Sequence, residues 1–170
     1  SLYKEIENKY FEYVEYYSAS YNNENFKISE NAENIFTYTE RLRSLIENQI
    51  QSKHKFIEIE SSIERFIRLT TVYKDLYGSY DYYNYLTSFL EPIYELNMDK
   101  GRILYNDISL EILNRLSLLK SSENSTNKEY IERLMDDEIY NFRDLIKNIY
   151  GFENESFLAQ QINKLNEFIN

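Results

Sequence analysis

The chain contains no cysteine among its 170 residues, so disulfide bonds, thiolate metal sites and cysteine nucleophiles are excluded. Its single histidine, His54, stands between Lys53 and Lys55 in a polar stretch. Zinc and di-iron helix motifs need at least two histidines, and a catalytic triad would have to use this one. We therefore expect no catalytic residue, no metal ligand and no cofactor, and interpret His54 as a solvated residue or part of a bend.

Glycine and proline are also scarce, with three and one residues respectively. Sheet proteins place turn residues at intervals of about 8–12 positions, so this scarcity favours long helices joined by few tight turns. Hydrophobic residues make up 42% of the chain, which is enough for a folded core. The sequence predicts an all-α protein, with a single domain over residues 1–170 built as a bundle of roughly six to eight mostly antiparallel helices.

The sequence has no apolar run approaching the roughly 18 residues of a transmembrane helix, and its opening residues do not form a signal peptide. It begins without methionine and becomes helical almost at once. This start predicts the C-terminal part of a longer chain, with another domain before residue 1. We expect no membrane contact and, since cysteine is absent, a cytoplasmic location.

The net charge of −10 is spread along most of the chain. Affinity for nucleic-acid phosphates comes from lysine and arginine, so a broadly acidic surface disfavours it. We expect no direct contact between this chain and nucleic acid.

Residues 30–77 form a long stretch without glycine or proline, and its apolar residues recur at helical spacing. The stripe fades across residues 51–55. One unbroken helix would be about 70 Å long, whereas a compact domain of this size has a radius of gyration of about 15 Å. Globule size thus favours a break and a helical hairpin, while the residue types at 51–55 favour one long helix, and both alternatives stay open.

Apolar residues at steps of three and four predict further helices elsewhere. The helix at 102–120 is apolar nearly all round, so we expect it to be the most buried. We expect a turn at residues 98–101 and a flexible linker at about 121–126. The remaining predicted helices span 2–19, 79–97, 127–150 and 155–169, and the one at 79–97 either kinks at Pro92 or is divided there into two helices.

Clustered carboxylates could hold Mg²⁺ on a helical bundle. The Glu-x-x-Glu pattern occurs about as often as chance predicts for so acidic a chain. A denser patch follows at Asp136, Asp137 and Glu138, with Asp144 after it. We interpret these residues mainly as surface acids of a helix, and keep a metal site as the alternative.

Tyrosine is the compositional oddity, with 18 residues. Tyrosine offers a large, rigid contact with a polar tip, which is why it concentrates at interfaces. In the helix at 2–19, the stripe from Leu2 through Ile6 and Tyr10 to Tyr17 should face the core, which leaves other tyrosines exposed; codon bias is the alternative explanation. The densest cluster gives the predicted partner-binding surface: Tyr77, Tyr80, Tyr82, Tyr83 and Tyr85.

An acidic helical chain, rich in tyrosine and without a starting methionine, resembles in general character the C-terminal half of Gram-positive phage-like repressors. The pathogenicity-island repressors of staphylococci, whose upstream half is a helix-turn-helix, are of this type. The resemblance implies a cytoplasmic homodimer that releases DNA when a protein partner, such as a phage protein, binds this half.

The expected function is therefore a non-enzymatic protein-interaction and dimerisation module. Two alternatives stay open: a metal-dependent all-α hydrolase that uses Glu and Asp clusters, and a peptide-sensing helical domain of a regulator. The predicted dimer contact lies on the long stretch and comprises Ile57, Ile63, Phe66, Ile67 and Tyr73.

Overall fold

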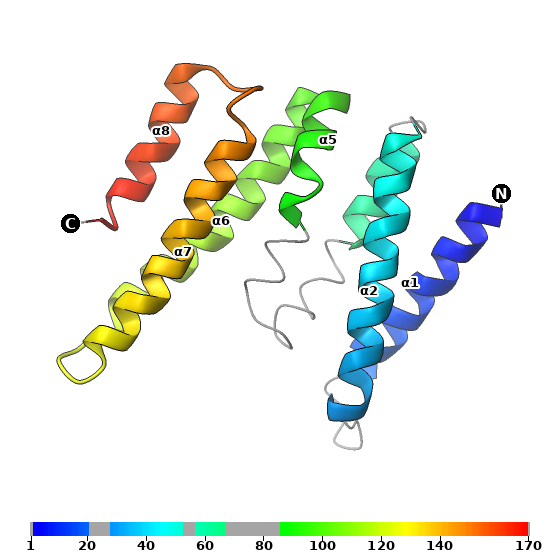
Figure 1. Ribbon diagram of the computed structural model, residues 1–170, viewed down its shortest axis with the longest axis horizontal. Helices are drawn as coiled ribbons and strands as arrows, with labels where there is room; N and C mark the ends of the chain where they lie inside the picture. Colours follow the sequence, from blue (N-terminus) through cyan, green and yellow to red (C-terminus); the bar gives the residue numbers. More distant parts are fainter. Residues whose placement is uncertain (1, 21–27, 53–56, 67–85, 170) are drawn as a thin grey trace. The chain divides into compact units, whose positions relative to one another are not determined.

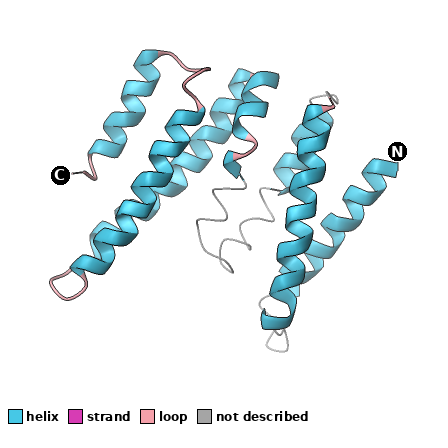
Figure 2. Cartoon of the chain, in the orientation of Figure 1, coloured by secondary structure: helices cyan, strands magenta, loops and turns pink. Residues whose placement is uncertain are grey.

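A computed structural model describes residues 2–20, 28–52, 57–66 and 86–169 of the chain. The regular elements in these ranges are all α-helices (Figures 1 and 2), which confirms the predicted all-α class. No helix in the described ranges has both the length and the apolar character that crossing a bilayer requires.

Contacts between residues divide the chain into two compact units, Ser1–Tyr85 and Leu86–Asn170. Each unit has its own buried apolar core. The prediction that residues 1–170 form a single domain stays a prediction.

The first unit is built on two long helices that pack along each other, α1 (Leu2–Ser20) and α2 (Ile28–Gln51). A third helical segment at 57–66 completes the described part of the unit (Figure 1). Burying one stripe from each helix removes apolar surface from water, and this is the main stabilising term of such a unit. The buried apolar residues are Phe11, Leu42, Ile46, Ile59, Ile63 and Phe66.

The described contacts decide between one long helix and a hairpin in the stretch 30–77. Helix α2 ends at Gln51, and Glu7 of α1 accepts hydrogen bonds from both Gln49 and Ser62. In a continuous helix these two donors, 13 residues apart in sequence, would be separated by about 20 Å. One carboxylate cannot span that distance, so the helix at 57–66 folds back beside α2, as globule size predicted.

The second unit contains four described helices whose core continues from one to the next. Its central helix α6 packs against both α5 and α7, and α8 packs against α7 (Figure 1). Most of the residues on the apolar stripes predicted from periodicity are buried, among them Ile108, Ile112 and Leu116, whereas Ile103 and Ile162 are exposed. The bounds are α5 Leu90–Leu96, α6 Met98–Ser122, α7 Lys128–Asn148 and α8 Glu155–Asn166.

The turn predicted at 98–101 is wrong, because α6 already begins at Met98. Asn97 is its N-cap, and the Asn97 side chain accepts a hydrogen bond from the backbone N–H of Lys100 at 3.0 Å. Gly101 therefore lies inside the helix and is buried. A β-carbon at Gly101 would lie 2.5 Å from Cγ of Tyr94, so the glycine is there to admit the tyrosine ring.

The sequence predicted that α6 would be the most buried helix, because it is apolar nearly all round. In the structure, one side of α6 is exposed. Its outward side exposes Ile103 and Leu110, whose side chains are 54% and 58% accessible. Its residues at 121–122 also belong to the helix rather than to a linker. The following turn is closed by hydrogen bonds from the backbone N–H groups of Thr126 and Asn127 to Asn124, so the expected linker is instead a short connection between two packed helices.

Candidate functional site

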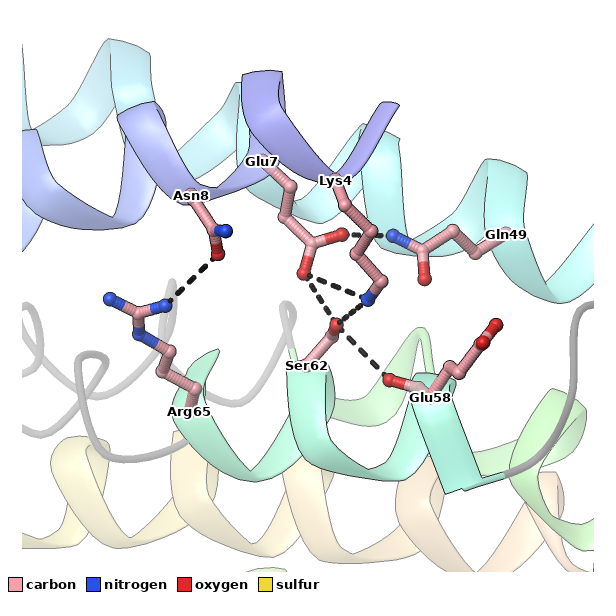
Figure 3. Close-up of polar contacts among 7 residues, drawn as sticks. All are labelled: Lys4, Glu7, Asn8, Gln49, Glu58, Ser62 and Arg65. Carbon is pink, nitrogen blue, oxygen red and sulfur yellow. Dashed lines mark hydrogen bonds and ion pairs between the residues drawn. The ribbon is translucent and has the colours of Figure 1, made fainter. Parts of the chain in front are cut away.

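A buried polar cluster around Glu7 joins the three described helices of the first unit (Figure 3). The Glu7 carboxylate is almost fully buried and accepts from the Gln49 amide and the Ser62 hydroxyl. Lys4 lies beside it, with its Nζ 3.6 Å from the Glu7 carboxylate and 3.1 Å from the Ser62 hydroxyl. A buried charge is tolerated when it is paired and hydrogen-bonded, and these partners provide both.

Arg65 makes a second set of contacts between the 57–66 helix and α1. Its guanidinium donates to Glu15 at 2.6 Å and to Asn8 at 3.4 Å (the Asn8 contact is drawn in Figure 3), and it lies 4.3 Å from the ring centroid of Phe11. The helix at 57–66 therefore covers the side of α1 that carries Asn8.

The opposite side of α1 is open. Residues two positions apart on a helix differ by about 200° in direction, so Ile6 points away from the side of Asn8 that the 57–66 helix covers. There α1 and α2 enclose a shallow groove of about 360 Å³. The groove is lined by Ile6 and Tyr10 of α1 and by Glu40, Arg41, Ser44, Leu45 and Asn48 of α2.

This surface combines an apolar floor with polar edges. Ile6 is 39% accessible, and Tyr13, seven residues further along the same stripe, is 50% accessible. The guanidinium carbon of Arg41 lies 5.8 Å from the ring centroid of Tyr10. We call Ile6, Tyr10 and Tyr13 together with the α2 lining residues the open face.

Charges at the edge of the open face are partly neutralised within α2. Arg43 donates to Glu40 at 3.1 Å and to Glu47 at 2.7 Å, one turn to either side. Arg41 also lies at the surface, so the residues that line the groove include charges of both signs.

The second unit contains a different polar cluster, in which Glu153 joins the α7–α8 turn to α5 and α6. The Tyr94 hydroxyl donates a hydrogen bond to Glu153 at 2.9 Å. Arg102 donates two hydrogen bonds to the same carboxylate, at 2.9 and 2.5 Å. The hydrogen bond from Arg102 holds the pKa of Glu153 below its usual value, and burial raises the pKa of Tyr94. The ring of Phe152 stacks on Tyr94 at 5.0 Å. Every member has a partner within the cluster, so the cluster holds the α7–α8 turn against α5 and α6.

The acidic patch on α7 does not converge on one point. Glu138 is buried and accepts from Arg115 of α6 at 3.2 Å, whereas Asp136, Asp137 and Asp144 are exposed. Within the described ranges, no group of three or more potential ligands could hold a metal ion.

The predicted sites have different outcomes. The partner-binding tyrosines Tyr77, Tyr80, Tyr82, Tyr83 and Tyr85 lie outside the described residues, as do Ile67, Tyr73 and His54. In the predicted dimer contact, Ile57 is 73% accessible, but Ile63 and Phe66 are core residues of the first unit. That part of the prediction is wrong, because the Ile63 and Phe66 side chains are buried inside the first unit.

The open face is the feature that the sequence did not reveal. The predicted core stripe of α1 ran through Ile6 and Tyr10, yet among the α1 side chains that the structure describes the buried ones are Glu7 and Phe11. Ile6 was predicted on a stripe with Tyr10, and its assignment to the core was wrong, because its side chain is 39% accessible.

Comparison of this chain with protein-family models, with curated proteins and with solved structures finds no match.

Proposed function

We propose that this chain is a non-enzymatic protein-interaction and dimerisation module. The observation that carries the proposal is the open face, where two helices fixed by buried polar contacts present a groove with tyrosine and aliphatic side chains. Helical modules bind partners by laying a helix or a helical surface into a groove of this kind. Exposed tyrosines supply rigid contact area at such surfaces at small entropic cost.

The biological setting in this proposal is the cytoplasmic sensor half of a transcriptional repressor, whose DNA binding is relieved by a protein partner. Its support is the resemblance in composition and helical character to the staphylococcal pathogenicity-island repressors. The acidic net charge also supports it, since such a half acts through protein contacts and leaves DNA to another domain.

Site-specific photocrosslinking tests the proposal. A photoreactive phenylalanine analogue replaces Tyr13 on the open face or, as the matched control, Tyr140 on the exposed side of α7. Both positions are exposed tyrosines of long helices, so neither replacement disturbs a core. We expect protein adducts from position 13 and none from position 140 when the variants are irradiated in the organism that encodes them.

The mass of the adduct distinguishes a second copy of the chain from another protein. Absence of any adduct at position 13, or equal adducts at both positions, contradicts the open face as the interaction surface.

A further inference from the structure

We propose that helix α8 is a hinged strap, which opens as one unit about Asn154 and exposes Tyr105 of α6 while the polar cluster around Glu153 stays closed. The inference concerns the second unit and goes beyond the proposed function, so the failure of either leaves the other standing. Three features of the second unit support it: the small apolar surface that α8 buries, the fixed turn before α8, and the polar pair that holds α8 on α6.

Helix α8 buries little apolar surface. Two of its 12 residues are buried, Gln161 and Leu165, and one of these is polar, whereas α7 buries seven of its 21. Ile162 is exposed, and α8 lies at the edge of its unit beside α7 (Figure 1). The free energy of a local opening rises with the apolar contacts that it breaks. We therefore expect α8 to open more easily than α6 or α7.

The turn before α8 is fixed independently of α8. The buried Glu153 carboxylate accepts hydrogen bonds from Tyr94 of α5 and from Arg102 of α6. The backbone N–H of Glu153 also donates to the Ile149 carbonyl at 3.0 Å. Asn154, which is exposed and has an extended backbone, is the single residue between Glu153 and the start of α8. A change in its backbone dihedral angles can therefore swing α8 without breaking the cluster.

A polar pair holds α8 on α6 in the closed state. The Tyr105 hydroxyl donates to the Gln161 amide oxygen at 3.2 Å, and both residues are buried. The Tyr105 ring also meets the half-buried Phe157 ring edge-on, with 5.8 Å between the centroids. Water can replace the hydrogen bond when α8 opens, so breaking this pair costs less than exposing an apolar pair of the same size. Opening brings Tyr105 and Leu165 to the surface as contact area that the closed form hides.

Amide hydrogen exchange of the whole chain, followed residue by residue by NMR, tests the inference with two matched substitutions. Tyr105→Phe removes the hydroxyl that donates to the buried Gln161 oxygen in the closed state, so it favours opening. Tyr94→Phe removes an equally buried hydroxyl from the Glu153 cluster, which is intact in both states, so it leaves the opening equilibrium unchanged.

In the unchanged chain we expect the amides of residues 159–166 to share one protection factor that is lower than those of α6 and α7. Tyr105→Phe should accelerate their exchange at least about fivefold, since a buried acceptor loses its donor. Tyr94→Phe should change it less than about twofold.

Four results overturn the inference. These are equal protection of α8, α6 and α7, protection that declines residue by residue towards the end of α8 as in simple fraying, equal acceleration by both substitutions, and no acceleration by Tyr105→Phe. If Tyr105→Phe unfolds the second unit, Lys120→Ala replaces it, because Lys120 is exposed and its Nζ lies 5.9 Å from the Phe168 ring centroid just beyond α8. We then expect about twofold faster exchange in α8, and no acceleration overturns the inference.

Discussion

Tyr94 lies so close to Gly101 that a methyl group on the glycine would come within 2.5 Å of the tyrosine ring. We expect Gly101→Ala to destabilise the second unit by about 1–3 kcal/mol, because overpacking outweighs the roughly 1 kcal/mol gained in helix propensity. Thermal unfolding measures the change. Ser117→Ala on the exposed side of the same helix is the control, and it should be neutral or slightly stabilising. Equal behaviour of the two variants would show that the ring moves aside without cost.

Gly101 also shows why part of the fold could not be predicted from sequence. Gly101 was interpreted as part of a turn, because glycine commonly interrupts helices and its contact with Tyr94 depends on how α5 folds onto α6. By contrast, most of the stripe residues predicted for α6 and α7 are buried, since helical periodicity is local and these faces are mainly apolar.

The open face was missed for a related reason. Hydropathy assigned Ile6 to the core, but the neighbouring Glu7 is buried instead and is satisfied by Gln49 and Ser62, which lie 42 and 55 residues away in sequence. These distant partners orient α1 so that Ile6 does not face the core, and no local sequence pattern reveals such partners. Only the fold could show that Ile6 remains at the surface.

Glu7 gives the second prediction. Glu7→Ala removes the acceptor that satisfies the Gln49 amide and the Ser62 hydroxyl, and leaves both donors buried. We expect a loss of about 2–4 kcal/mol in the stability of the first unit. Glu12→Ala on the exposed side of α1 should cost less than about 0.5 kcal/mol. Hydrogen exchange of α1 and α2 measures both, and similar protection in the two variants would contradict a stabilising role for the cluster.

Glu153 gives a prediction on pH. The Arg102 contact lowers the pKa of Glu153 in the folded state, so the unfolded state binds more protons as the solution is acidified. The stabilisation is complete above about pH 4.5 and is lost as the pH falls through the lower folded value. Glu153→Gln should cost about 1–2 kcal/mol at pH 7, since Arg102 is partly exposed and screened by water.

Urea unfolding at pH 7 and pH 3 measures this effect, with Glu123→Gln in an exposed turn as the control. The difference between the unchanged chain and Glu153→Gln should shrink at pH 3. A difference that stays constant with pH would mean that the Arg102 contact does not stabilise the fold through charge.

The hydrolase alternative makes a distinct prediction about divalent metal. A site that binds Mg²⁺ or Mn²⁺ only in the folded state raises the melting temperature as the metal concentration increases. The exposed acids Asp136, Asp137 and Asp144 do not converge with Glu138, so we expect no rise in millimolar Mg²⁺ beyond that in matched NaCl. A metal-specific rise that is abolished by Asp136→Asn with Asp137→Asn would favour the hydrolase.

The absence of natural cysteine allows the most direct test of whether the proposed dimerisation uses the open face. Single cysteines replace Ser44 in the groove or Ser117 on the outward side of α6, both of which are exposed serines of long helices. Each variant is treated with a flexible bis-maleimide at the same protein concentration. We expect covalent dimers from Ser44→Cys and little product from Ser117→Cys. Equal yields, or dimers from Ser117→Cys alone, would contradict a pair joined through α1 and α2.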